Sequence, residues 1–528
     1  MLMEKHTCAA RLDALCRPGQ TVCLDWKRMK YIGWWTLFFG LVAYGYLFFN
    51  ANFSHDSMIS IYEESPDMML SFGRFLRPVY RLLRGKFLLP AVNGFLLLVF
   101  LWLSTYFITD ILKLQKKLTV VLTCGILVTN STVSLTNATY LHDADAYGLC
   151  LLLAVLGVWA ALRLRRGELI AAVLYFLSLG IYQAYIQAAV YLLLILALVR
   201  LLRGEKVSAV YGETFRHLLP MAASMVLYFL AANLTQKLTQ VADAETYNSV
   251  GSALNLSVES LLERGYHFLE ALDMWFFYPV GHSMPVQLGI NLAMVALAAF
   301  FAISVCVSNK LPKGNVWGAL GVVAAIPFGM NFIVPISNFF HWIMVYSFNL
   351  SYVCVLALCE LREQTAGEGK ISRAARALCA ALVCVLIYDN CLYSNEIALK
   401  KQLENDATLS AYTRIIDRME QTEDYVPGQT PVAILGLLGN GPLNSYRAGF
   451  SLNGTGVWFN FSTTHPLSHQ RYLDYYLGYP AEFVTGAELE ALKENPQVLQ
   501  MHPFPAADSI RMVDGVLVIL LSYDMETA

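Results

Sequence analysis

Charged side chains are scarce in this chain. Asp, Glu, Lys and Arg make up 14% of its 528 residues, whereas hydrophobic residues make up 57%. Soluble proteins carry roughly a quarter charged residues, so the composition excludes an ordinary soluble protein and predicts a polytopic membrane protein. The net charge of -2 also lacks the basic surplus of a nucleic-acid-binding protein, which excludes a nucleic-acid partner.

Several familiar sources of chemistry are missing as well. Cysteine is absent after Cys391, so residues 394–528 cannot form a disulfide of their own. The amino-terminal Cys8, Cys16 and Cys23 are spaced too widely for a convincing zinc site. Residues 394–528 also lack a phosphate-binding glycine motif, a nucleophile elbow and metal-ligand spacing. The chemistry is therefore expected outside this region.

Residues 394–528 do have the composition of a folded soluble domain. An amphipathic helix is expected at 396–422 and a buried strand at 431–436. Two further strands are expected within 509–522, joined at Asp514-Gly515, which is a strong hairpin signal. The sequence therefore predicts a small α/β domain here.

Long apolar runs are what the chain has in abundance. A membrane span needs roughly 20 apolar residues, so the sequence predicts an all-α membrane protein with about eleven transmembrane helices. The expected spans are 31–50, 89–112, 118–137, 146–162, 169–182, 184–202, 217–236, 286–308, 315–335, 339–361 and 375–393.

Basic residues in the short loops predict the orientation of these spans. The polar residues 1–30 are expected to be a cytoplasmic tail, and residues 31–393 a transmembrane catalytic domain with outer loops at 51–88 and 237–285. Residues 394–528 are then expected to form a soluble domain outside the membrane.

Basic residues normally gather in the cytoplasmic loops, and the expected outer loop at 51–88 does not follow this rule. Arg74, Arg77, Arg81 and Arg84 follow one another at steps of three and four, which predicts a helix with one basic and one apolar face. Such a helix suits the membrane interface. Its basic face could attract ordinary anionic lipid headgroups, or it could bind the phosphate of a substrate.

Acidic residues gather at the same outer face. His55-Asp56 follows the first span, with Glu63 and Glu64 a few residues later, and His142-Asp143-Ala144-Asp145 joins the third span to the fourth. Carboxylates beside hydrocarbon are expensive and often functional, although an Asp at the end of a span can also be a simple interfacial residue.

These residue types suit sugar transfer, which needs a general base and a positive group for the leaving phosphate. Asp56 fits the base, and Arg74, Arg77 or Arg81 could meet the phosphate. Asp143 or Asp145 could orient the acceptor. A divalent cation, Mg²⁺ or Mn²⁺, would be held by these three aspartates if one is used.

Other polar residues on the outer side are candidates for a substrate groove. Tyr182 and Gln183 lie in a turn between two spans, and His282 follows a helical, aromatic-ended stretch of the second outer loop. His55, His142 and the glutamates of the first outer loop complete this set.

The order of these features resembles the GT-C superfamily of membrane glycosyltransferases. NFSHDSM at 52–58, LSFGRFLRPVY at 70–80, TYLHDADAYGLCLLLAVLGVW at 139–159 and LGIYQAYIQAAVYLL at 179–193 look like the type II Gtr glucosyltransferase family. The resemblance implies Asp56 as catalytic base, Asp143 or Asp145 as the second acid, and inversion at the anomeric carbon. It also implies a polyprenyl-phosphate-linked hexose donor. The family often has a paired acid in the first loop, where this chain has His55-Asp56, so the resemblance does not decide the metal requirement.

The leading hypothesis is therefore a bacterial plasma-membrane enzyme that transfers a hexose, glucose by resemblance, to a cell-surface glycan. A transporter or flippase for lipid-linked glycans is the alternative; it would place charged residues deep within several spans. A third alternative is a receptor that binds glycan through residues 394–528.

Overall fold

The computed structural model describes residues 8–11, 23–50, 52–61, 66–243, 257–278, 283–365, 369–445, 452, 454 and 456–525. Among them, eight helical segments are long and apolar enough to cross a membrane, which agrees with an all-α polytopic membrane protein. They contain α1 (Trp26–Phe49), α4 (Pro90–Ile111), α5 (Lys117–Thr129) with α6 (Ser131–Thr139), α7 (Ala144–Arg163), α9 (Gln187–Leu202), α10 (Val207–Thr239), α12 (Gln287–Ser308) and α16 (Lys370–Glu420).

The expected count of eleven spans is not confirmed. The three other expected spans coincide with helices that are too short or too polar to qualify by length and composition. These are α8 (Gly167–Ile181), α13 (Lys313–Asn331) and α15 (Leu350–Thr365), with the short α14 (Ile333–Ser337) between the last two.

The helix bundle has an apolar outer surface. Large side chains such as Trp34 on α1, Leu230 on α10 and Trp317 on α13 are exposed, the last to 73%. A soluble protein rarely exposes apolar surface on this scale. Inside, α7 packs against α4 and α8, and this buried position holds the residues from Ala144 onward.

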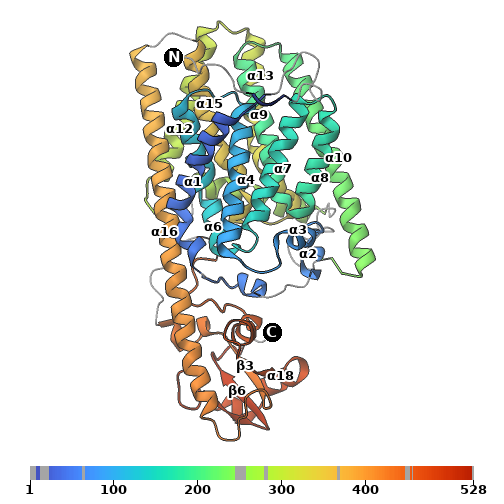
Figure 1. Cartoon of the computed structure of the whole chain (residues 1–528), viewed down its shortest axis with the longest axis vertical. Helices are drawn as coiled ribbons and strands as arrows, with labels where there is room; N and C mark the ends of the chain where they lie inside the picture. The colour runs from blue at the N-terminus through green and yellow to red at the C-terminus, as the bar shows by residue number, and fades with distance from the viewer. Residues whose placement is uncertain are drawn as a thin grey trace.

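Short helices cover one end of the bundle. The loop between α1 and α4, which the sequence predicts to be outside the membrane, forms α2 (Asp67–Ser71) and α3 (Arg77–Arg84), and the next long loop forms α11 (Val258–Phe276). Figure 1 places α2 and α3 at the end that carries the carboxy-terminal sheet, and the start of α1 at the opposite end. The described amino-terminal residues form a strand pair, β1 (Cys8–Arg11) and β2 (Cys23–Asp25).

The most visible difference from expectation is the length of α16. The sequence predicts a span at 375–393 and a separate helix at 396–422, whereas the structure has one helix of 51 residues. At 1.5 Å per residue it rises about 76 Å, far more than the roughly 30 Å hydrocarbon core. It therefore connects the bundle directly to the carboxy-terminal region (Figure 1).

The carboxy-terminal region contains a four-stranded sheet in the order β4-β3-β6-β5. The expected strand is confirmed as β3 (Pro431–Leu435), parallel to β6 (Val516–Leu520) and to β4 (Glu482–Phe483). The expected hairpin is also confirmed: β5 (Ile510–Val513) pairs antiparallel with β6 across Asp514-Gly515, both at positive φ. The helices here are α17 (Pro466–Arg471), α18 (Gly486–Lys493) and α19 (Pro496–Leu499).

Candidate active site

A cavity of about 160 Å³ opens at the end of the bundle that α2 and α3 cover. It brings together residues that are far apart in the chain, from the first outer loop, the turn before α7, and the turns after α8 and α14. Six of the predicted site residues line it: Asp56, Arg74, Arg77, His142, Asp143 and Tyr182.

Asp56 lies at the accessible side of this cavity. Its side chain is 32% exposed, and its Oδ2 lies 3.3 Å from Nε2 of His55, which is 15% exposed. Burial lowers the pKa of His55 to about 4, so the imidazole is neutral at pH 7. The contact is therefore not an ion pair at neutral pH, and His55 does not cancel the charge of the Asp56 carboxylate.

Arg74 supplies the positive charge of the cavity. Its guanidinium lies 4.7 Å from the ring centroid of Tyr182 and 5.2 Å from that of Phe72. Within the described part of the chain, no carboxylate forms an ion pair with Arg74, and its buried Nε has no hydrogen-bond partner. An anionic ligand in the cavity could therefore pair with this side chain.

Arg77 differs from Arg74 because it already has a carboxylate. Its side chain is buried and forms an ion pair with Asp143 through Nη2 and Oδ2. Asp143 also lies 3.6 Å from Nε2 of His142. Its second oxygen, Oδ1, is buried and has no hydrogen-bond partner among the described residues, so it remains available to a substrate hydroxyl.

Asp145 does not line the cavity. It is completely buried, with Arg84 Nε at 3.1 Å, and it accepts hydrogen bonds from Tyr80 (2.7 Å) and Asn93 (2.9 Å). Burial and the Asp145 carboxylate raise the pKa of the Tyr80 phenol, which therefore keeps the proton that it donates. The arrangement ties α3 to α4 and α7.

These ion pairs account for two of the basic residues in the loop between α1 and α4, Arg77 and Arg84. The basic face of α3 points into the protein toward Asp143 and Asp145, while Val79, Leu82 and Leu83 are exposed on the other face. Arg81 is buried and donates to the backbone oxygen of Lys86. The negative charge that compensates the basic residues of this loop therefore comes in part from the chain itself, through Asp143 and Asp145.

The remaining predicted groove residues are placed less centrally or lie outside the described residues. Gln183 donates from Nε2 to the Phe72 carbonyl (3.0 Å) and to Tyr228 (2.5 Å), which positions the turn rather than the cavity surface. Glu63, Glu64 and His282 lie outside the described residues.

The aspartates do not fit a divalent cation site. No group of three or more His, Cys, Asp or Glu side chains among the described residues could hold a metal ion. Asp143 and Asp145 each pair with a guanidinium, which competes with a cation for the same oxygens. We therefore assign no step to a metal.

Sequence reasoning missed several cavity residues. Tyr140, Tyr147 and His341 line it, and the His341 ring centroid lies 6.1 Å from that of Tyr140. Burial lowers the pKa of His341 to about 4, so it is neutral at pH 7. The available signal was a histidine near the start of the expected span 339–361, but a histidine among aromatic residues is also typical of a buried core.

The carboxy-terminal region holds the loop that carries Asp56. Asn405 of α16 accepts a hydrogen bond from the Phe53 N–H (3.1 Å) and donates one to the Phe53 carbonyl (2.9 Å). Met58 is fully buried in a hydrophobic core shared with Ile415, Val432 and Tyr472. The position of Asp56 therefore depends on residues more than 340 positions away.

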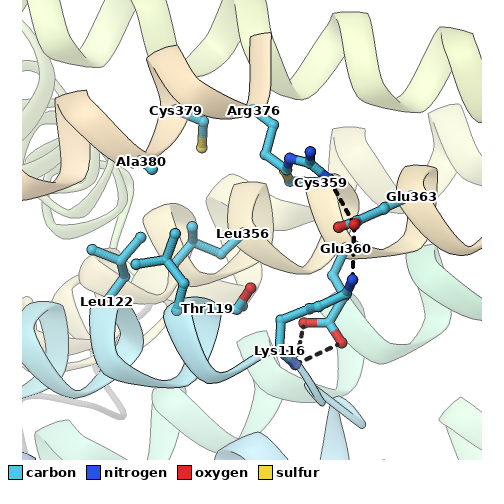
Figure 2. A pocket seen from close by; sticks show the side chains of 11 residues that line it. Lys116, Thr119, Leu122, Leu356, Cys359, Glu360, Glu363, Arg376, Cys379 and Ala380 are labelled. Carbon is cyan, nitrogen blue, oxygen red and sulfur yellow. Dashed lines mark hydrogen bonds and ion pairs between the residues drawn. The ribbon is translucent and has the colours of Figure 1, made fainter. Parts of the chain in front are cut away.

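A second cavity, of about 230 Å³, contains none of the predicted site residues. It lies where α5 begins and α15 ends, and Figure 2 shows Lys116 and Arg376 converging on Glu363. Both distances to Glu363 Oε1 are short, 2.8 Å for Lys116 and 2.6 Å for Arg376. These charges link α5, α15 and α16 and favour a structural role.

Comparison with protein families gives a match over the region that forms the first cavity. A family model described as Glucosyl transferase GtrII matches residues 45–356, which is more than half of the chain. The matched range includes every residue of the first cavity and ends before α16 and the sheet. Comparisons with curated proteins and with solved structures gave no match.

Proposed function

Because the chain belongs to the GtrII glucosyl transferase family, we propose that it transfers glucose from a polyprenyl-phosphate carrier to a cell-surface glycan at the outer face of a bacterial plasma membrane. One observation supports this most strongly. Asp56, a partly exposed carboxylate, and Arg74, an arginine without a carboxylate partner among the described residues, line the same cavity. Transfer from a phosphate-linked donor needs both groups.

In the proposed reaction, Asp56 takes the proton of an acceptor hydroxyl. The hydroxyl oxygen forms a bond to the anomeric carbon while the bond from that carbon to the phosphate oxygen breaks. The electron pair of the broken bond leaves with polyprenyl phosphate, and Arg74 stabilises its negative charge. Attack opposite the leaving phosphate inverts the configuration at the anomeric carbon. Asp143 Oδ1 would accept a hydrogen bond from a sugar hydroxyl.

The surroundings of the cavity suit a lipid-linked donor. Leu82 and Leu83 of α3 are exposed, the latter to 86%, and Arg77 on the opposite face of the same helix reaches the cavity. A polyprenyl chain could lie against this apolar face while its phosphate enters the cavity. The same end of the bundle carries the sheet, where a glycan outside the membrane would be accessible (Figure 1).

A reconstituted system distinguishes this function from donor transport. The purified chain is placed in liposomes that contain polyprenyl-phosphate glucose labelled in the sugar, together with extracted envelope glycan. We expect label in the glycan and release of polyprenyl phosphate, with neither in protein-free liposomes. Passage of labelled donor across the bilayer without labelled glycan would instead support a flippase.

A further inference from the structure

An aromatic pair from the carboxy-terminal region lies beside the proposed base. The ring of Phe459 contacts the ring of His55 at 5.1 Å between centroids, and the ring of Trp458 contacts Phe459 at 4.8 Å. Trp458 is 61% exposed. His55 is in turn 3.3 Å from Asp56, so a continuous set of contacts joins an exposed indole to the reacting carboxylate.

The chain around these rings is fixed against the transmembrane helices. Val457 is fully buried in the core of the bundle, directly before Trp458. Gly456 has φ +74°, and a Cβ there would lie 2.2 Å from Oγ1 of Thr139 at the end of α6. Because only a glycine permits this close approach, the position of the aromatic pair relative to the cavity is set by packing.

A side-chain amide, which is uncharged and forms hydrogen bonds, directly follows the two rings in the chain. Asn460 donates from Nδ2 to Oδ1 of Asn444 at 2.5 Å, in an exposed position. An exposed aromatic face beside side-chain amides suits a pyranose ring, whose C–H bonds pack on the ring while its hydroxyls bond to amides. A membrane anchor would instead be expected among apolar residues, as for Leu82 and Leu83 on α3.

We propose that Trp458 and Phe459 form a platform that binds a pyranose unit of the acceptor glycan beside Asp56. The proposal rests on the proposed function for the identity of the ligand, and it adds a site beyond the residues that the family comparison matches. Stacking on Trp458 would hold the acceptor with a hydroxyl directed toward Asp56, while the donor occupies the side of the cavity that Arg74 lines.

Binding without donor tests the platform independently of transfer. The full chain in nanodiscs is applied to an array of bacterial surface polysaccharides, as the unaltered protein, as Trp458→Ala and as Trp458→Tyr. We expect Trp458→Ala to weaken glycan binding roughly tenfold, a common loss for an aromatic anchor, and Trp458→Tyr to restore most of it. Trp317→Ala, which removes a still more exposed indole from α13, is the matched control and should bind normally.

Three outcomes would overturn the platform: no glycan binding by the unaltered protein, equal binding by Trp458→Ala, or an equal loss in Trp317→Ala. A Trp458→Ala variant that binds glycan normally but loses activity in bilayers and not in detergent would identify the indole as a membrane anchor. Transfer by Asp56→Asn tests the proposed function separately, because Asp56→Asn should still bind glycan as the unaltered protein does.

Discussion

At the scale of single residues, the arginines of the first outer loop have different partners. Arg77 and Arg84 pair with Asp143 and Asp145, and all four side chains are buried. Arg74 has aromatic neighbours and, among the described residues, no carboxylate. Spacing in the sequence treats these arginines as equivalent, but their partners predict different consequences of substitution.

The Arg74→Ala variant should raise the KM for the lipid-linked donor and leave folding unchanged. A charge-assisted hydrogen bond contributes about 1.5–3 kcal/mol, so we expect a rise of roughly ten- to a hundredfold. Steady-state transfer at varied donor concentration measures it. Arg165→Ala, at an exposed position between α7 and α8, is the control. An unchanged donor KM would show that the role of Arg74 is purely structural.

Asp145→Asn should destabilise the protein rather than act on chemistry directly. It leaves Arg84 buried without its counter-charge, which typically costs about 3–5 kcal/mol. Thermal unfolding in detergent should therefore begin at a lower temperature, whereas Glu259→Gln on the exposed face of α11 should change nothing. Normal stability with a lost kcat would show that Asp145 has a role in the reaction.

At the scale of elements, periodicity in the sequence predicted individual helices and strands well, but it did not predict where one helix continues into the next. The three- and four-residue steps of the arginines correctly predict α3 for Arg77, Arg81 and Arg84, whereas Arg74 precedes the helix. Asp514-Gly515 correctly predicts the β5–β6 hairpin. The sequence predicts a break after residue 393 because the composition turns polar there. That prediction is wrong, because no Pro or Gly interrupts α16. Lys401 and Glu404, buried and 3.1 Å apart, pair within the continuous helix.

The continuity of α16 gives Asn405 a positioning role that can be tested. Asn405→Ala removes both hydrogen bonds to Phe53, so the loop with Asp56 should become less ordered. We expect kcat to fall roughly tenfold, the effect of losing about 1–3 kcal/mol of buried hydrogen bonding, with little change in donor KM.

Gln402→Ala is the matched control for Asn405, since it removes a more exposed amide from the same helix. A donor KM that rises as much as kcat falls would indicate general loosening of the cavity instead. Equal activity of Asn405→Ala and the unaltered protein would show that the loop is held by Met58 and its neighbours alone.

At the scale of the whole molecule, the basic residues in the loops could suggest which loops lie on which side of the membrane, but not which residues form the cavity. The cavity combines Asp56, Arg74, Asp143 and His341 from separate segments. No periodic pattern connects these segments, so their meeting depends on how α7 packs between its neighbours. Residue types at the span ends suggested Asp56 and Asp143 or Asp145, and the resemblance supported them, whereas His341 and the contacts from residues 456–459 required the structure.

The orientation itself makes a whole-molecule prediction. Alkaline phosphatase fused after the last residue should be active, because the carboxy-terminal sheet is proposed to lie outside the membrane, where the enzyme folds. A fusion at Gly204, between α9 and α10 at the opposite end of the bundle, should be inactive. The reverse pattern would invert the assignment and place the proposed acceptor site in the cytoplasm.

The most direct test of the account is glucose transfer by Asp56→Asn in purified, reconstituted protein. Loss of a general base typically lowers the rate by about 10²–10⁴-fold, so we predict a fall of this size with donor binding and thermal stability unchanged. Asp67→Asn, an exposed carboxylate of the same loop that does not line the cavity, should transfer normally. Full transfer activity of Asp56→Asn would contradict the proposed site.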